Sequence, residues 1–362
     1  MDLKPAPPPA EDPYPLQQIQ PPPSEPSTPP DHRSHIVYGP FGLRALWSLL
    51  IYFAMVGIVV GGYFFVIHQG EPSNHAVTIT KTTPSPATTP STPPTEAHAT
   101  ESLSAMIIGE ATLFLAFFFI SWVMAIIERR SLTVFGLGGT HPIRRFLTGS
   151  FWGLTTISLL ILILHSLHLL VFDTLLDHGT DILYWGGLQL FGFLLVGLTE
   201  EYTMRGYLQF TLTRGMVSIG NRISPRHART IGFWLAAVLT SALFLYLHTY
   251  NAGEDWLGLA QIFLAGVVFV VALWRTGSLW WGIGFHMAWD WGQSFLYGVP
   301  DSGGLMQGRL FTTHAVGKTL LSGGSVGPEG SIFCAPVCLL AILILFLTHP
   351  SPQPPLETEA EP

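Results

Sequence analysis

Long blocks of apolar residues, separated by short polar connections, dominate the chain. Each block approaches or exceeds the roughly 20 residues that an α-helix needs to cross the hydrocarbon layer of a membrane. The blocks lie at 41–67, 104–127, 146–172, 183–212, 230–248, 257–274, 278–297 and 331–348. They lack the alternating pattern of barrel strands, and a helix satisfies its own backbone groups in lipid. The pattern therefore predicts an all-α, polytopic transmembrane bundle of about eight spans.

The segments between and around these blocks differ from them in composition. The Pro-rich start of the chain can bury little surface, and a Thr/Ser/Pro-rich stretch is typical of an exposed loop. The first block is too long and begins too late for a cleavable signal peptide, so we expect it to remain as a span. The predicted order is a disordered tail at 1–40, a first span at 41–68, an exoplasmic loop at 69–103, a membrane-embedded core at 104–298, a Gly-rich loop at 299–330, a last span at 331–348 and an acidic tail at 349–362.

Composition agrees with a protein that faces lipid. Charged residues make up 11% of the 362 residues, against about 25% in soluble domains. The formal net charge is -7, and no basic patch suited to nucleic acid occurs, so we expect no nucleic-acid partner. The two cysteines, Cys334 and Cys338, lie four residues apart in an apolar block, and we interpret them as packing residues.

Arginines give the predicted orientation. Two connections are rich in them, one after the second block with Arg129, Arg130, Arg144 and Arg145, the other after the fourth with Arg214, Arg222, Arg226 and Arg229. By the positive-inside rule both connections are cytoplasmic. The connections that lack Lys and Arg carry Asp173, Asp177 and Asp181, and Glu254 and Asp255. These fall on the opposite side, which places both termini in the cytoplasm.

Three groups of polar residues stand within the apolar blocks. They are Glu200, Glu201 and Arg205 in the fourth block, Phe244 and His248 in the fifth, and His286 and Asp290 in the seventh. Ionisable groups at membrane depth are costly and usually face a protein interior or a wet cavity. The alternative for the first group is that its span ends near Leu198 and the acids lie at its cytoplasmic mouth.

Helical spacing indicates how some of these side chains are arranged. Glu201 and Arg205 are four residues apart and can pair on one face, whereas Glu200 points about 100° away from Glu201. His286 and Asp290 also lie four residues apart, so both can project into one cavity. A lone intramembrane histidine often only hydrogen-bonds between helices, but polar groups on three separate spans indicate a shared site.

In this order the motifs Glu-Glu-x-x-x-Arg, Phe-x-x-x-His and His-x-x-x-Asp resemble those of the CPBP family. That family contains the type II CAAX prenyl endopeptidases and the bacterial bacteriocin-processing or immunity proteins also called Abi. The stretch from Gly266 to Leu279 is similar to the one that precedes the third motif in these proteins, and the resemblance covers about 129–297. It implies a glutamic endopeptidase of the bacterial inner membrane that cuts a membrane-associated peptide or protein, such as a prenylated or bacteriocin-like substrate.

The resemblance also implies roles for the site residues. Amide hydrolysis without a serine or cysteine nucleophile needs an activated water and donors for the oxyanion. Glu200 would be the general base, with His248 helping to hold and polarise the water. Glu201 and Arg205 would support the site, with Phe244 completing the second motif, and His286 would stabilise the oxyanion together with residue 290. No cofactor is implied.

Asp290 departs from the family pattern, because many members have Asn at this position. An ionised aspartate would repel an oxyanion. Either Asp290 is held protonated, or it accepts a hydrogen bond from His286 and orients that ring, which is the interpretation we prefer.

Other interpretations remain open. Glu, His, His and Asp are competent zinc ligands, although the chain has no His-Glu-x-x-His, so a zinc metalloprotease is an alternative. A chaperone, immunity factor or transporter could use the same polar cluster for binding. One difficulty concerns depth: Glu200 comes past the middle of a span that runs inward, whereas His248 comes late in a span that runs outward. Straight helices with these predicted bounds would separate them.

Overall fold

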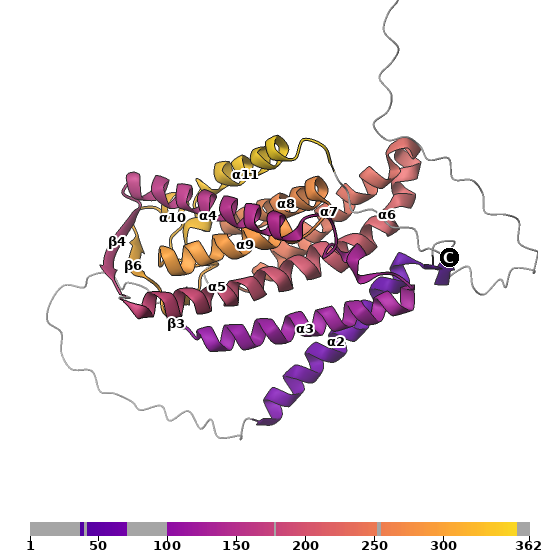
Figure 1. Cartoon of the computed structure of the whole chain (residues 1–362), viewed down its shortest axis with the longest axis horizontal. Coiled ribbons are helices and arrows are strands. Elements are labelled where there is room, and N and C mark those ends of the chain that lie inside the picture. The colour runs from indigo at the N-terminus through magenta and orange to yellow at the C-terminus, as the bar shows by residue number, and fades with distance from the viewer. Residues whose placement is uncertain (1–36, 40–41, 71–99, 177–178, 252–254, 353–362) are drawn as a thin grey trace, which may run out of the picture.

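The computed structural model describes residues 37–39, 42–70, 100–176, 179–251 and 255–352 of the chain. The predicted acidic tail beyond 352, nearly all of the N-terminal tail and most of the Thr/Ser/Pro-rich loop lie outside these residues. Helices dominate the described part and run side by side along its long axis (Figure 1).

The α-helices are α2 Ala45–Gly70, α3 Leu103–Glu128, α4 Pro142–Ser166, α5 Thr180–Glu201, α6 Gln209–Ile223, α7 Ala228–His248, α8 Trp256–Thr276, α9 Trp280–Trp291, α10 Thr319–Ser322 and α11 Cys334–Thr348. The 3-10 turns are η1 Leu132–Phe135, η3 Pro225–His227 and η5 Pro328–Gly330, and the π-helical segments are η2 Tyr202–Leu208 and η4 Gly292–Leu296. The strands are β1 Tyr38–Gly39, β2 Gly42–Leu43, β3 Thr100–Glu101, β4 Leu170–Leu175, β5 Leu305–Met306 and β6 Phe311–Ala315.

The protein is an integral membrane protein with several apolar helices. Five described helical stretches are long and apolar enough to span a membrane, at 103–128, 142–166, 180–223, 225–248 and 256–276. The predicted total of about eight spans is not confirmed. Helix α11 has 15 residues, or about 22 Å, and α9 has 12, whereas the hydrocarbon layer is about 30 Å thick. Helix α9 is also buried by protein along most of its length.

Small sheets at one end of the bundle correct the prediction in two places. The third apolar block was expected to stay helical to residue 172, but α4 ends at Ser166 and β4 follows. Strand β4 pairs antiparallel with β6, which lies in the segment expected to be a Gly-rich loop. Strands β3 and β5 pair nearby in parallel. Because each strand's partner lies far away in the sequence, local hydrophobicity could not distinguish these residues from the end of a helix.

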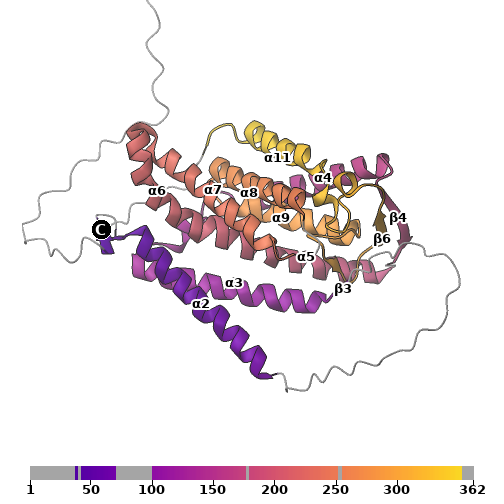
Figure 2. The same ribbon diagram turned by 180° about the vertical axis from the view of Figure 1, so that it is seen from behind.

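The two ends of the bundle differ in structure and in composition. The cap end comprises the sheets β3–β5 and β4–β6 with the loop segments at 297–330. The arginine end carries the residues Arg44, Arg129, Arg130, Arg144, Arg145, Arg214, Arg222, Arg226, Arg229 and Arg275. Figures 1 and 2 show the strands β3, β4 and β6 at one end of the molecule and the tips of α6 and α7 at the other.

Helix α9, which carries the third motif, is held in the middle of the bundle by very close contacts with α4. A Cβ added to Gly149 would lie 2.0 Å from the carbonyl oxygen of Trp281, and one added to Gly153 would lie 2.3 Å from that of Phe285. Small residues four apart let two membrane helices approach at backbone distance. The backbone of α9 is therefore fixed against α4, and its opposite side faces α5 and the cavity described below.

Helices α6 and α7 form an antiparallel hairpin whose register decides the depth of the second motif. Its contacts pair Val217 with Gly232, Gln209 with Thr240, and Arg205 with Phe244. Each step of four residues along one helix is matched by four along the other. One further turn sets His248 level with Glu201. The difficulty with depth came from the bounds of the fourth apolar block, because residues 180–223 form one continuous helical stretch and Glu200 lies near its middle.

Candidate active site

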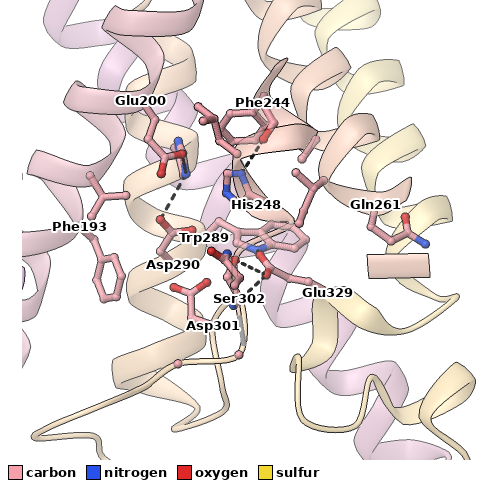
Figure 3. Close-up of a pocket in the computed structure, with 18 of the residues that line it drawn as sticks. Phe193, Glu200, Phe244, His248, Gln261, Trp289, Asp290, Asp301, Ser302 and Glu329 are labelled. Carbon is pink, nitrogen blue, oxygen red and sulfur yellow. Dashed lines mark hydrogen bonds and ion pairs between the residues drawn. The ribbon is translucent and has the colours of Figure 1, made fainter. Parts of the chain in front are cut away.

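A cavity of about 790 Å³ opens among the helices that carry the three motifs. Its lining includes Glu200 from α5, His248 from α7, and His286 and Asp290 from α9. Figure 3 shows Glu200, His248 and Asp290 around the same space. The structure thus brings together four residues that stand up to 90 positions apart in the sequence.

Glu201 and Arg205 form the predicted ion pair behind the cavity wall. Arg205 Nη1 donates to Glu201 Oε1 at 3.0 Å, and the side chains are 0% and 1% exposed. The guanidinium lies 4.3 Å from the ring centre of Phe244 and 5.1 Å from that of Phe269, so both rings contribute cation–π attraction. Phe244 of the second motif therefore contacts the first motif directly, and the pair anchors α7 and α8 to the long helical stretch.

His286 lies among three carboxylates. Its Nδ1 is 3.3 Å from Glu201 Oε1, and its Nε2 is 3.6 Å from Glu200 Oε2 and 3.5 Å from Asp290 Oδ2. The ring stacks on Phe269 with a centre-to-centre distance of 4.8 Å and an interplanar angle of 26°. Both ring nitrogens face carboxylate oxygens, and both can donate only when the ring is protonated.

His248 has a defined tautomer. Its Nδ1 lies 2.8 Å from the carbonyl oxygen of Phe244, and a carbonyl can only accept, so the Nδ1–H is the donor. In the neutral ring, Nε2 is then left with a lone pair. The Phe244 ring packs against the imidazole at 4.4 Å. The spacing of the second motif thus serves both to orient His248 and to cover Arg205.

Two π-helical segments directly follow the motif residues. The segment η2 begins one residue after Glu201, and η4 begins two residues after Asp290. Inserted π turns inside α-helices occur frequently at functional sites, because they alter the directions of nearby side chains. No residue pattern used in the sequence analysis could indicate them.

Four further acids line the cavity, and the sequence analysis missed their part in it. Glu101 belongs to strand β3. Glu110 on α3 contributes a buried Oε2 without a hydrogen-bond partner, and Asp301 and Glu329 reach in from the cap end. Glu110 could have been found as an acid within the second apolar block. Asp301 and Glu329 lie in a segment expected to be a loop, and nothing in their local sequence indicates that the chain folds back onto the site.

Asp290, Asp301 and Glu329 form one compact group. Ligand oxygens from these three residues all lie within 4.8 Å of one another. Burial, reinforced by the charges of Asp290 and Glu329, raises the pKa of Asp301 well above its usual range. Ser294 Oγ donates to Asp301 at 3.2 Å, and Trp289 Nε1 donates to Glu329 at 3.1 Å. An oxygen-only set of this kind lacks the nitrogen or sulfur ligands that zinc sites usually contain.

Comparison with known families identifies one segment of the chain. Residues 182–292 match the family described as type II CAAX prenyl endopeptidase Rce1-like. No curated protein and no solved structure matches the chain. The matched segment is shorter than the stretch over which the motifs suggested a resemblance, but it contains all three motifs. The resemblance is therefore confirmed over residues 182–292, which match a family of membrane proteases.

Proposed function

We propose that this protein is an intramembrane endopeptidase that hydrolyses a peptide bond in a membrane-associated substrate with a water activated by Glu200 and His248. One observation carries the proposal: Glu200, His248, His286 and Asp290 line one cavity large enough for a peptide segment. We place the protein in a bacterial inner membrane with its arginine end in the cytoplasm. Prenylated and bacteriocin-like peptides are the candidate substrates.

The first step assigned to the site is formation of the nucleophile. The lone pair of His248 Nε2 accepts a hydrogen bond from the water, while a Glu200 oxygen takes its other proton. The resulting hydroxide attacks the carbonyl carbon of the scissile bond. When the tetrahedral intermediate collapses, Glu200 returns the proton to the departing amine. A carboxylate suits this cycle because it can accept a proton as a general base and return it as a general acid.

His286 is assigned to the oxyanion that develops on the carbonyl. A protonated ring donates from Nδ1 to Glu201 and keeps Nε2–H for the substrate oxygen. Stacking on Phe269 and the Glu201–Arg205 pair limit the ring's movement, so the donor does not need to reorganise during the reaction. Glu201 and Arg205 are positioning residues, because their atoms act through His286.

Asp290 is assigned to the orientation of His286. Its Oδ2 lies 3.5 Å from Nε2, on the same side of the ring as Glu200. A carboxylate at this point favours the protonated ring. It also competes with a substrate oxygen for Nε2–H, so substrate entry must displace that contact. No metal is assigned a role in these steps.

The closing experiment compares wild type with Glu200→Gln on a membrane-anchored reporter peptide. Glutamine keeps the shape of the side chain and removes the basic oxygen, so we expect a rate loss of at least about 10²-fold. Asp173→Asn is the matched control, because it makes the same chemical change on the exposed strand β4, where Asp173 pairs with His314. Equal cleavage by all three proteins would refute the proposal and leave a binding role, as in a chaperone, immunity factor or transporter.

A further inference from the structure

The two ends of the bundle differ strongly in charge. Of the 13 Lys and Arg residues that are described, ten lie at the arginine end, while Arg205 is in the site and Arg309 and Lys318 are in the cap. Four described acids belong to the cap end, namely Glu101, Asp173, Asp301 and Glu329, and Asp181 and Asp255 lie at the starts of α5 and α8. Cytoplasmic ends of membrane helices carry the excess of Lys and Arg. The cap end is therefore the exoplasmic end.

The motif residues on α7 and α9 lie near the cap-facing ends of those two helices. Glu200 precedes Arg214 by 14 residues on one helical stretch, a distance of roughly 20 Å along the axis. With Arg214 at the cytoplasmic boundary of a hydrocarbon layer about 30 Å thick, Glu200 lies in the outer half of the membrane. His248 is at the same level, at the cap-facing end of α7.

The polar part of the cavity lining continues to the cap surface. Beyond the motif residues it comprises Glu101 at the start of the described cap, Tyr250 and Asn251 after α7, and Ser302 and Gly304 in the cap loop. Tyr250 is 76% exposed. These residues all follow or precede helices at the cap end, so the water-accessible mouth of the cavity is on that side. Figure 2 shows the strands of the cap at the opposite end of the molecule from the tips of α6 and α7.

A second, apolar part of the lining faces sideways. Leu113 on α3 and Leu247 on α7 both line the cavity, yet they are 39% and 47% exposed. A residue that touches the cavity and is also exposed lies at an edge of the opening. At this level of the bundle the surroundings are the lipid chains of the outer leaflet. An apolar anchor can therefore remain in lipid while the attached peptide reaches Glu200.

The charge of the lining limits which peptide can lie there. Six carboxyl groups line the cavity, from Glu101, Glu110, Glu200, Asp290, Asp301 and Glu329, and its described lining contains no Lys or Arg. Like charges brought together at low dielectric repel strongly. A flanking segment with basic residues is therefore favoured over an acidic segment or a nearby free carboxylate.

We infer that the substrate is a membrane-anchored peptide that enters from the exoplasmic leaflet, with its anchor between α3 and α7 and a basic flank at the cap mouth. This inference rests on the proposed function, because it names the substrate of that site. It places the cleaved bond in the outer half of the membrane, where a peptide exposed only to the cytoplasm cannot reach it.

Sidedness is tested by labelling in intact cells with a membrane-impermeant maleimide. Single cysteines are placed by Tyr250→Cys and Ser302→Cys at the mouth and by Ser218→Cys at the arginine end, in full-length protein carrying Cys334→Ala and Cys338→Ala. We expect the two mouth positions to react in intact cells and Ser218→Cys to react only after permeabilisation. The reverse pattern overturns the inference and leaves the proposed hydrolysis untouched. Ser218 and Tyr250 are exposed, so these two variants should fold normally.

Charge preference is tested with two reporters that share a transmembrane anchor and differ only in two Lys or two Glu beside the cleaved bond. We expect kcat/KM for the Lys reporter to be at least about tenfold higher. The variant Glu329→Gln should bring kcat/KM for the Lys reporter closer to that for the Glu reporter. Equal use of both reporters, or preference for Glu, contradicts the inferred basic flank. Glu200→Gln on the Lys reporter decides the proposed function separately.

Discussion

Two ion networks, one at the arginine end and one beside the cavity, both consist mainly of glutamates and arginines. They differ in how completely their polar atoms are hydrogen-bonded. At the arginine end, Glu128 Oε1 accepts from Tyr207 at 2.9 Å and Glu128 Oε2 accepts from Arg214 at 2.7 Å, and Arg130 Nε lies 3.4 Å from the same Oε2. Arg214 also donates to the carbonyl of Leu43 at 2.8 Å. The network ties α3, the long helical stretch and the segment before α2 together.

Beside the cavity the corresponding network is left incomplete. Arg205 makes one hydrogen bond to Glu201, and its Nε and Nη2 have no hydrogen-bond partner. Glu200 Oε2 and His286 Nδ1 are also buried without one, although each faces an opposite charge at 3.3 to 3.6 Å. Buried polar groups in proteins are usually satisfied. The first network joins three segments of the chain, whereas in the second an oxygen of Glu200 without a hydrogen-bond partner lies beside the cavity.

The largest effect is expected when the acid of each network is removed. Glu201→Ala leaves the buried Arg205 without its carboxylate, and breaking such a pair costs about 3–5 kcal/mol. Glu128→Ala does the same to Arg214, which is partly buried, so its cost should be smaller. Both variants should unfold at lower temperature. The rate per folded molecule should fall sharply in Glu201→Ala, because His286 loses the carboxylate that faces its Nδ1, but should stay near wild type in Glu128→Ala. Thermal unfolding in detergent and reporter cleavage measure the two quantities. Normal cleavage by Glu201→Ala would show that the networks do not differ in role.

A smaller effect is expected at Asp290, which belongs to the incomplete network but acts only on the orientation of His286. Asp290→Asn keeps an oxygen that can accept from the ring, so cleavage should stay within about tenfold of wild type. The measurement is kcat for the same reporter, with circular dichroism as the control for folding. Abolished turnover would instead make Asp290 a metal ligand or an essential proton carrier.

The smallest effect, no change at all, is expected on metal removal. The mechanism proposed for the cavity assigns no step to a metal, so dialysis against EDTA and 1,10-phenanthroline should leave the cleavage rate unaltered. Loss of cleavage that zinc alone restores would support the zinc alternative. Loss that calcium or magnesium restores would point instead to the oxygen-only group of Asp290, Asp301 and Glu329.

Sequence reasoning identified the parts of the site that depend on local spacing. The pairing of Glu201 with Arg205 follows from their separation of four residues, and the structure confirms it. Placing His286 and Asp290 on one helical face also follows from spacing, and both line the cavity. The close contact of His286 with Glu201 could not be found in this way, because it depends on how α9 packs against α5.

The sequence by itself determined that the chain is an integral membrane protein. Apolar blocks of about 20 residues with so few charges form helices whose surfaces are compatible with lipid and not with water. It also determined the order of the motifs and hence the family of residues 182–292. Only the tertiary structure decided the depth of His248, since it is set by the register of the α6–α7 hairpin. It alone brought Asp301 and Glu329 to the cavity, because a loop's path depends on distant packing and not on local periodicity.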